Sequence, residues 1–351
     1  MLMFKVSSRS RIAAAILTVA LVAPGAVARA ADEPKVLQAT TRPADQSEAQ
    51  MMQQSAQDYR ARARYPENSW PTNRDQIRAE RITYPNWVTD PDPSAPARAA
   101  WAAEVSFEYP APVILFFKSS VPADSVIGEV VYCESGCDPG EVIGRVEYND
   151  AGLESDRKAG DGIYTARFTV PEERVPDLAD SYSVRIKVFV GGQVYWAGCG
   201  FNYSDPKAHL TGRYRDSLQD GSLVISAEIV VKEKGRFHLA GVIAAIASGD
   251  DEPIGEAQTA AELEPGRYWL HLSFYGLMFH ERKAAGPYKL TSLALTTATR
   301  MPGAMNAVVY NALTTRAYGL GQMTSKSFGE PNLLEAARRL DAAAAEEARK
   351  R

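Results

Sequence analysis

An acidic, glycine-containing stretch in the middle of the chain is the best candidate for metal chemistry. Residues 149–156 read NDAGLESD, and Asp161-Gly162 follows five residues later. Calcium takes about six to eight oxygen ligands, which carboxylates on such a loop can supply. If the loop binds calcium, we expect Asp150, Asp156 and Asp161 to be its ligands. The spacing departs from the EF-hand template, and Asp and Gly also close turns through side-chain hydrogen bonds and positive φ angles, so both interpretations stay open.

The chain has three cysteines, Cys133, Cys137 and Cys199. In an oxidising compartment two of them can form a disulfide that persists. Cys133 and Cys137 enclose three residues, of which Gly136 can supply a tight turn. We predict a disulfide between Cys133 and Cys137, with Cys199 as the alternative partner of either one. A metal site would need more ligands nearby than the sequence offers.

Aromatic residues on expected strands form a second kind of candidate site. Trp196 and Trp269, with Tyr195 beside the first, lie where a ring could stack on a sugar or pack on a partner protein. We take Trp196 and Trp269 as candidate binding residues for a protein or glycan partner. Such rings more often pack in a core or between domains, and this alternative stays open.

The motifs that identify common enzymes are missing. There is no G-x-S-x-G elbow, and Ala284 stands where a zinc-protease helix that began at His280 would need its second histidine. Gly319-Leu320-Gly321 lacks the third glycine of a dinucleotide loop. The histidines fall on expected strands or strand ends without ligand spacing: His209, His238, His271 and His280. We predict a non-enzymatic protein without a cofactor, apart from the calcium considered above.

The N-terminus has the layout of a secretory signal peptide. Lys5, Arg9 and Arg11 precede an apolar run over residues 12–22, and small residues follow Pro24-Gly25. We expect residues 1–30 to be removed by cleavage after Ala30, or alternatively after Ala28. The apolar run is shorter than the roughly 20 residues of a membrane-spanning helix, and no later segment is as apolar. The processed chain is therefore expected in the periplasm or the secreted fraction, without an integral membrane segment.

Charge gives no reason to expect nucleic acid as a partner. The chain holds 39 Lys and Arg against 43 Asp and Glu, a formal net charge of −4 at pH 7. A protein that neutralises many phosphates is normally rich in basic residues. We therefore expect neither nucleic acid nor anionic lipid to be bound.

The elements that must position these residues are strands. Residues 31–105 read as a proline-rich, partly ordered arm. From 106 to 205, alternation such as Tyr182, Val184, Ile186 and Val188 predicts strands with one buried face, and Gly191-Gly192 predicts a hairpin. Residues 206–300 repeat this pattern, with Leu270 and Leu272 inward and Trp269 and His271 outward.

Residues 301–351 read as an irregular segment followed by a helix from about Asn332, with Leu333, Ala337, Leu340 and Ala344 at helical spacing. The predicted fold class is therefore all-β: two tandem immunoglobulin-like β-sandwich domains with an irregular N-terminal arm and a short C-terminal helix.

Three groups of motifs resemble a family of exported bacterial proteins with tandem immunoglobulin-like domains, the choice-of-anchor X-like proteins of unknown function. They are residues 59–66 (YRARARYP), the AGDGIYT turn at 159–165 with Asn149-Asp150, and the set GPYKL at 286–290, PGAMN at 302–306 and TRAY at 315–318. Together they span most of the mature chain. The resemblance implies sandwich domains outside the cytoplasm and brings no catalytic residues with it.

These observations predict an exported, non-enzymatic protein that serves as a binding or structural module of the cell envelope or the secreted fraction. The alternative is a carbohydrate-binding or calcium-stabilised adhesion protein.

Overall fold

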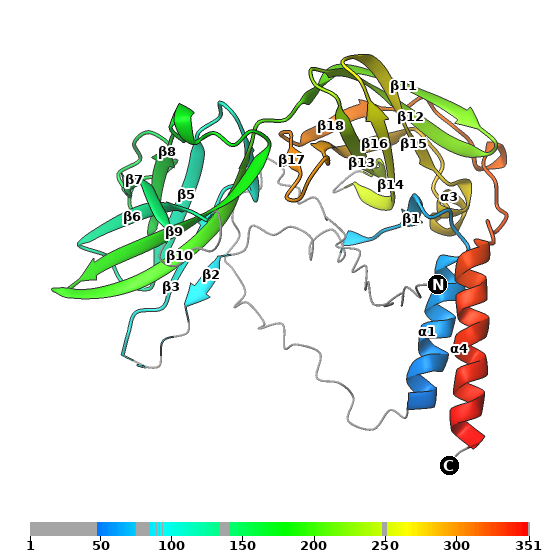
Figure 1. Cartoon of the computed structure of the whole chain (residues 1–351), viewed down its shortest axis with the longest axis horizontal. Coiled ribbons are helices and arrows are strands. Elements are labelled where there is room, and N and C mark those ends of the chain that lie inside the picture. The colour runs from blue at the N-terminus through cyan, green and yellow to red at the C-terminus, as the bar shows by residue number, and fades with distance from the viewer. Residues whose placement is uncertain are drawn as a thin grey trace, which may run out of the picture.

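The computed structural model describes residues 48–74, 85–88, 90, 92, 94–133, 140–247 and 251–349. The predicted signal peptide and Cys137 lie outside these residues. In the described part of the chain, strands predominate and form four sheets, which belong to two β-rich units (Figure 1). Among the same residues, no helix has both the length and the apolar character that a membrane span requires.

The first β unit (residues 86–204) contains two of the sheets. One has the strand order β2-β3-β5-β8, with β2 Asn86–Val88, β3 Arg98–Ala102, β5 Val113–Ser119 and β8 Ile163–Phe168. The other has the order β4-β10-β9-β6-β7, with β4 Ser106–Glu108, β10 Gln193–Ser204, β9 Ala179–Val190, β6 Ser125–Tyr132 and β7 Glu141–Glu147. A short 3-10 helix, η1 (Glu172–Arg174), precedes β9. Strand β4 runs parallel to β10, whereas the other pairs are antiparallel.

Alternation along the strands explains the core of this unit. Tyr182, Val184, Ile186 and Val188 are each at most 2% exposed, as the period of two predicts. They join residues from the other sheet, such as Phe117, in one buried cluster. The predicted hairpin is confirmed: Gly191 and Gly192 both have positive φ and connect β9 to β10, which pair antiparallel from Val190 and Gln193 onward.

The second β unit (residues 208–323, together with β1) contains the other two sheets. The three-stranded sheet has the order β11-β12-β15, with β11 Ala208–Gln219, β12 Ser222–Val231 and β15 Gly266–Phe274. The six-stranded sheet has the order β1-β14-β13-β16-β17, and β18 also pairs with β16. Its strands are β1 Ser69–Pro71, β13 Gly235–Ala245, β14 Glu252–Leu263, β16 Tyr288–Thr297, β17 Ala304–Met305 and β18 Val309–Thr314. Helix α3 (Gly276–Arg282) and η2 (Leu320–Gln322) complete the unit.

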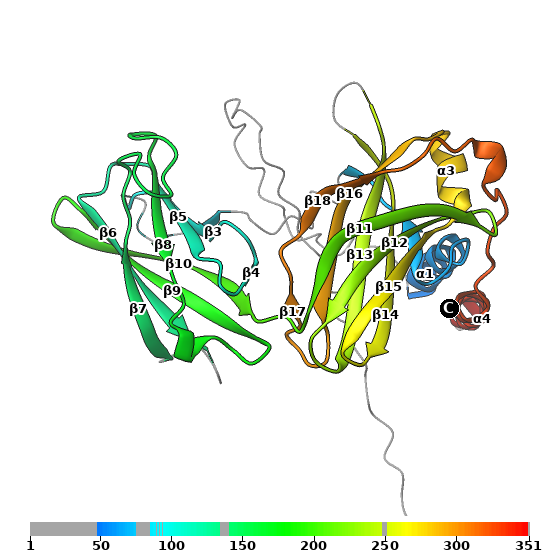
Figure 2. The ribbon, with the colours of Figure 1, turned by 90° about the horizontal axis from the view of Figure 1, so that it is seen from above.

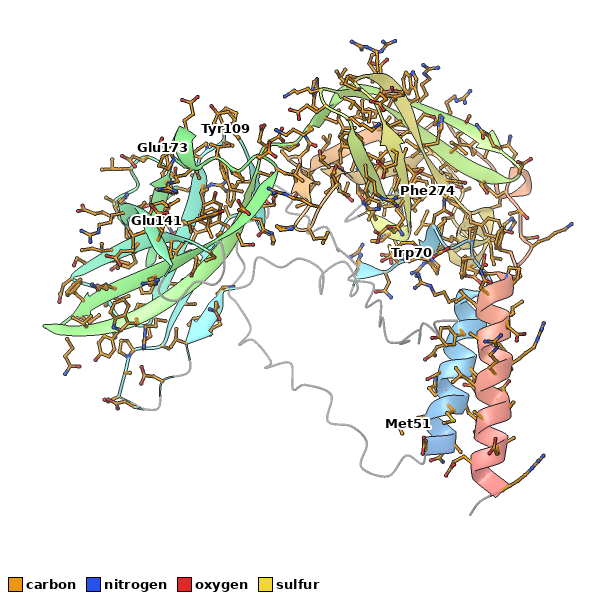
Figure 3. The ribbon with its side chains drawn as sticks, viewed as in Figure 1. Met51, Trp70, Tyr109, Glu141, Glu173 and Phe274 are labelled. Carbon is orange, nitrogen blue, oxygen red and sulfur yellow. The ribbon has the colours of Figure 1, made fainter. Side chains whose placement is uncertain are left out.

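Buried residues of both sheets form the second core, which includes Tyr288 and Phe274. Figure 3 labels Phe274 in this core. Leu270 and Leu272 point inward and His271 is exposed, as the alternation predicted.

The two units repeat one strand order. The short strands β1, β2, β4 and β17 are left out of this comparison. When the remaining strands of each unit are counted along the chain, the first, second and fifth form one sheet: β3-β5-β8 in the first unit and β11-β12-β15 in the second. The fourth, third, sixth and seventh are neighbours in the other sheet: β7-β6-β9-β10 in the first unit and β14-β13-β16-β18 in the second. The same topology therefore occurs twice, and β10 leads into β11 through only three residues (Figure 2).

The N-terminal arm, read from the sequence as irregular and partly ordered, supplies strands to both units. Strands β2 and β3 complete one sheet of the first unit, and β1 pairs with the edge strand β14 of the second. The frequent prolines argued against strands in this part of the sequence, because proline cannot donate to a strand ladder. Pro71 is tolerated because β1 is an edge strand, where a missing N–H breaks no ladder.

The arm also contains helix α1 (Glu48–Arg62), which packs against α4 (Pro331–Arg349), and the pair extends from the second unit with Met51 near its far end (Figures 1 and 3). Ala56 on α1 and Ala337 and Ala344 on α4 are fully buried. Alanines allow helix axes to approach closely, so the narrow stripe predicted from the sequence serves helix packing. The C-terminal helix itself was predicted, and it begins at Pro331.

The segment after residue 300 is more ordered than expected, since it supplies β17, β18 and η2. The TRAY motif accounts for part of this order. Thr315 exchanges hydrogen bonds with Tyr288, and Tyr318 donates to Asp216 on β11. Tyr318 O also accepts from Gly286 N, which connects this motif to GPYKL. Several motif residues therefore build the core of the second unit.

The two units contact each other where β4 and the end of β10 meet the segment around β17. Glu108 accepts hydrogen bonds from Asn306 Nδ2 (3.1 Å) and from Ala307 N (2.8 Å). Ser204 Oγ donates to Met305 O at 3.0 Å. Leu178, Ala179 and Ala304 form a small apolar cluster beside these bonds.

Candidate functional site

The three predicted aspartates come together in the loop that connects β7 to β8. Oxygens of Asp150, Asp156 and Asp161 all lie within 4.8 Å of one another. An antiparallel bridge between Asn149 and Thr165 closes the base of the loop. Gly152 has a φ of +69°, and a Cβ there would lie 3.0 Å from Ala159 N, so glycine is required at this position.

Backbone N–H groups already bind these carboxylates. Asp150 accepts from the N–H groups of Asp161 and Gly162, both at 3.1 Å. Asp156, only 7% exposed, accepts from Gly152 N (2.7 Å) and Lys158 N (3.1 Å). These hydrogen bonds are the ones that the turn-closing interpretation predicts. Because carboxylate oxygens have further lone pairs, the same arrangement can also supply three oxygen ligands to a hard cation such as calcium.

A groove of about 620 Å³ lies between β3 and β10 in the first unit. Polar side chains and glycines line it together with aromatic residues: Asn86, Trp101, Glu104, Ser181, Ser183, Gly198, Gly200, Phe201 and Asn202. Burial raises the pKa of Glu104 above its ordinary value. The groove combines hydrogen-bonding groups with apolar surface, which is the usual composition of a ligand site.

The open edge of β10 runs along this groove. Strand β9 pairs with β10 over its whole length, but β4 covers the opposite edge only at residues 202–204. Along that edge Gly198 O accepts from Asn86 Nδ2 at 3.0 Å, and Asn202 N donates to Val105 O at 2.7 Å. In an antiparallel strand the N–H and C=O of alternate residues point the same way. Gly200 therefore directs its backbone polar groups to the same edge, where no described strand pairs with it.

Arg98 holds the neighbouring end of β10 in place. Its side chain is 4% exposed, and it donates to Trp196 O (2.7 Å), Pro96 O (3.1 Å) and Asp90 Oδ2 (2.7 Å). The hydrogen bond from Arg98 is the main reason why the pKa of Asp90 lies below its ordinary value. The buried guanidinium thus ties the segment before β3 to β10 beside the groove.

Cys199 faces the core beneath this groove and carries a free thiol. The alternative disulfide through Cys199 is therefore not formed, because its side chain points into the first unit's core. Burial raises the pKa of Cys199 to about 12, so the thiol is protonated at neutral pH and is a poor nucleophile. The disulfide between Cys133 and Cys137 stays a prediction, since Cys137 lies outside the described residues.

The two candidate tryptophans belong to different units and do not form one platform. Trp196 is 50% exposed on β10, with Lys187 Nζ 5.1 Å from the ring centre. Trp269 lies on β15, and the guanidinium of Arg215 covers its ring at 3.6 Å. Trp269 therefore offers little free ring face to a sugar. Trp87 on β2 is 45% exposed and lies next to Asn86, which lines the groove.

Sequence reasoning missed the contribution of Asn86, Trp87, Arg98 and Glu104, because all four lie in the segment that read as an arm. The one available signal was the small, apolar stretch that follows Arg98, which resembles a short buried strand.

One serine–histidine contact lies far from the groove. Ser226 Oγ and His271 Nδ1 are 2.8 Å apart, on cross-strand neighbours of β12 and β15. The pair is exposed, and it does not line the groove between β3 and β10. A hydrolase needs its nucleophile and base beside a place for the substrate, and the groove lies in the other unit.

The fold and sites define a β-rich protein with two topologically equivalent units and an open groove on the first. Residues 207–309 match the model of the C-terminal domain of DUF4785, a domain of unknown function. The resemblance to choice-of-anchor X-like proteins stays a prediction. None of the curated protein sequences matches the chain.

Two solved structures are similar to parts of the chain. A crystal structure of a DUF4785 family protein from Legionella pneumophila is 17% identical, with 66% of this chain and 59% of that chain covered and a TM-score of 0.44. The apo structure of beta-glucuronidase 3 from Bacteroides uniformis is 12% identical, with 62% of this chain and 25% of that chain covered and a TM-score of 0.20. The chain therefore spans less than two thirds of either protein.

Proposed function

We propose that this protein is an exported, non-enzymatic binding or structural module of the cell envelope or the secreted fraction, built from two immunoglobulin-like β-sandwich domains. The repeated strand order supports the domain type, because an immunoglobulin-like fold also divides its strands into a sheet with the first, second and fifth and a sheet with the third, sixth and seventh. The groove between β3 and β10 is the ligand surface of this module.

The observation that carries the binding role is the uncovered edge of β10 at the groove. A ligand there meets the backbone N–H and C=O of Gly200, the side chains of Asn86 and Asn202, and the apolar surface of Phe201. These groups suit a neutral or weakly charged polar ligand that can both donate and accept hydrogen bonds. Gly198 and Gly200 keep this part of the outer face free of side chains, so such a ligand can approach the backbone closely.

Carbohydrate recognition is the second candidate, and the position of two exposed rings favours it. Trp196 lies two residues from Gly198 on the same face of β10, and Trp87 follows Asn86 on β2. Rings that flank a polar groove can stack on successive sugar units while hydroxyl and amide groups bind their oxygens. Calcium stabilisation through the aspartate loop is compatible with either role.

The test is binding of the full chain to a panel of glycans and extended peptides, with a variant that fills the groove. Ser183→Trp places an indole among the lining residues, whereas Ser217→Trp makes the same change on β11 of the second unit. We expect Ser183→Trp to abolish binding that the wild type and Ser217→Trp retain. Equal binding by all three proteins would place the ligand elsewhere and contradict the assignment of the groove.

Trp196→Ala then separates the two candidates. If the ligand is a glycan, the variant should bind about tenfold or more weakly, since stacking on an aromatic ring carries much of the affinity. Unchanged glycan affinity in Trp196→Ala would contradict the carbohydrate interpretation.

A further inference from the structure

A second, smaller cavity of about 220 Å³ lies where the two β units meet. We call it the junction cavity. Residues 104–108 and Ala111 line it from the first unit, and residues 305–308 and Tyr310 line it from the second. These lining residues include two carboxylates and no lysine, arginine or histidine. A ligand in the junction cavity therefore meets negative charge and oxygen atoms.

The strand geometry of β4 turns oxygen atoms toward the second unit. Phe107 is 7% exposed and packs in the first core. Ser106 and Glu108, its neighbours, consequently share the opposite face of the strand. Glu104, in the bend before β4, lines both the junction cavity and the groove.

Asn306 faces this strand from the second unit with a fixed orientation. Its Nδ2 donates to Glu108 Oε1 at 3.1 Å, and because a carboxylate only accepts, the amide nitrogen must face Glu108. The opposite atom, Oδ1, is buried and has no hydrogen-bond partner, although the residue is only 7% exposed. Ser106 Oγ is likewise buried without a partner. Buried polar atoms of this kind are rare, and a bound water or ion is one way in which such an atom is satisfied.

The charge of Glu104 is uncompensated as well. None of the ion pairs found among the described residues involves it. Burial alone raises its pKa. A water molecule could satisfy Asn306 and Ser106, but it would leave this carboxylate without an opposite charge. A cation supplies the opposite charge, and it also accepts oxygen ligands such as the two unpartnered atoms.

We propose that the junction cavity binds a divalent cation of the calcium class, held by the carboxylates of Glu104 and Glu108 and by Asn306 Oδ1. Calcium accepts carboxylate and amide oxygens together and tolerates irregular geometry, and the cavity leaves room for waters that complete its coordination. Because Glu104 and Glu108 belong to the first unit and Asn306 to the second, the bound ion joins the two units. This site is separate from the aspartate loop, and it shares Glu104 with the lining of the proposed ligand groove.

The experiment is a calcium titration by calorimetry on the metal-free full chain. All proteins carry Asp161→Asn, which removes a ligand from the aspartate loop and so isolates the junction cavity. We expect one calcium ion per chain, and at least about tenfold weaker binding when Glu104→Gln is added, since calcium affinity follows the number of charged ligands. Glu104 takes part in no hydrogen bond among those found in the described structure, so this variant should fold normally.

The matched control is Glu173→Gln, at an exposed position of η1 in the first unit that does not line the junction cavity (Figure 3). It should bind calcium like its parent. Asn306→Ala provides a second variant on the other unit and should also weaken binding, and its thermal melting in metal-free buffer shows whether it is folded. Absence of saturable binding in the Asp161→Asn protein, or equal affinity in the Glu104→Gln and Glu173→Gln variants, would show that the cavity holds only water and would overturn the proposal.

Discussion

The hydroxyl of Tyr318 donates a 2.6 Å hydrogen bond to the carboxylate of Asp216, although the two residues are 102 positions apart. Arg316 donates to the same carboxylate at 3.1 Å, and the Asp216 side chain is only 13% exposed. This contact fastens the segment after β18 to β11, at the open end of the three-stranded sheet. It gives the TRAY motif a physical role in the second unit.

We expect Tyr318→Phe to lower the free energy of unfolding of the second unit by about 1–2 kcal/mol, because a hydrogen bond to a charged acceptor is lost while the ring remains. Urea unfolding followed by fluorescence measures the effect. Tyr59→Phe is the control, since Tyr59 is 40% exposed on α1. Equal stability of the two variants would contradict this role of Tyr318.

The same contact predicts a pH dependence. Burial acts to raise the pKa of Asp216, but hydrogen bonds from Tyr318 and Arg316 outweigh it, so the pKa lies below its ordinary value. A carboxyl with a lowered pKa in the folded state stabilises the protein fully above its unfolded-state pKa of about 4, and this stability is lost as the pH falls through the folded-state pKa. Asp216→Asn should therefore be less stable than the wild type by about 1–3 kcal/mol at pH 7. The difference should shrink below about pH 4. A difference that does not change between pH 7 and pH 3 would exclude this linkage.

The stability of the first unit should depend on the guanidinium group of Arg98 and not only on its positive charge. Arg98→Lys cannot reproduce three hydrogen bonds made by a planar guanidinium, so we expect a loss of about 2–3 kcal/mol in the first unit. Arg145→Lys, at a side chain that is 75% exposed, is the matched control and should change stability by less than about 0.5 kcal/mol. Chemical denaturation measures both. Hydrogen exchange along β10 should also be faster in Arg98→Lys alone.

Calcium should stabilise the first unit if the aspartate loop binds it. The test uses a chain that carries Glu104→Gln, so that the junction cavity contributes little. Calcium at about 100 times its dissociation constant should then raise the free energy of unfolding by about 2.7 kcal/mol and the melting temperature by several degrees. Asp161→Asn should remove this increase. Asp156→Asn should lower stability even without calcium, because Gly152 N and Lys158 N lose a charged acceptor. If calcium leaves the melting temperature unchanged, the three aspartates only close turns.

The helix pair depends on its small residues. Ala337→Leu inserts a larger side chain where α4 is fully buried, and we expect it to destabilise the pair by about 1–3 kcal/mol. Ala345→Leu, at an exposed position of the same helix, is the control. Hydrogen exchange of residues 48–62 reports the effect, because loss of packing on α4 should expose the amides of α1. Equal protection of α1 in both variants would contradict close packing at Ala337.

The alternation of apolar residues by itself determined which faces the long strands of the two units bury, because a period of two leaves only one face to the core. It placed Val184 and Ile186 inward, Trp269 and His271 outward, and a hairpin at Gly191-Gly192. It also placed the three loop aspartates in one loop, since local turn chemistry connects neighbours in the chain.

Only the tertiary structure decided which distant segments meet. Arg98 contacts Trp196 across the first unit, and Asn306 contacts Glu108 across the junction. Arg215 on β11 covers Trp269 on β15, across the intervening strand β12. A short strand bounded by prolines has too little pattern of its own to reveal that it completes a sheet. Its burial depends on partners about a hundred residues away, as the 98 positions between Arg98 and Trp196 show, and those partners are brought close only when the whole core forms.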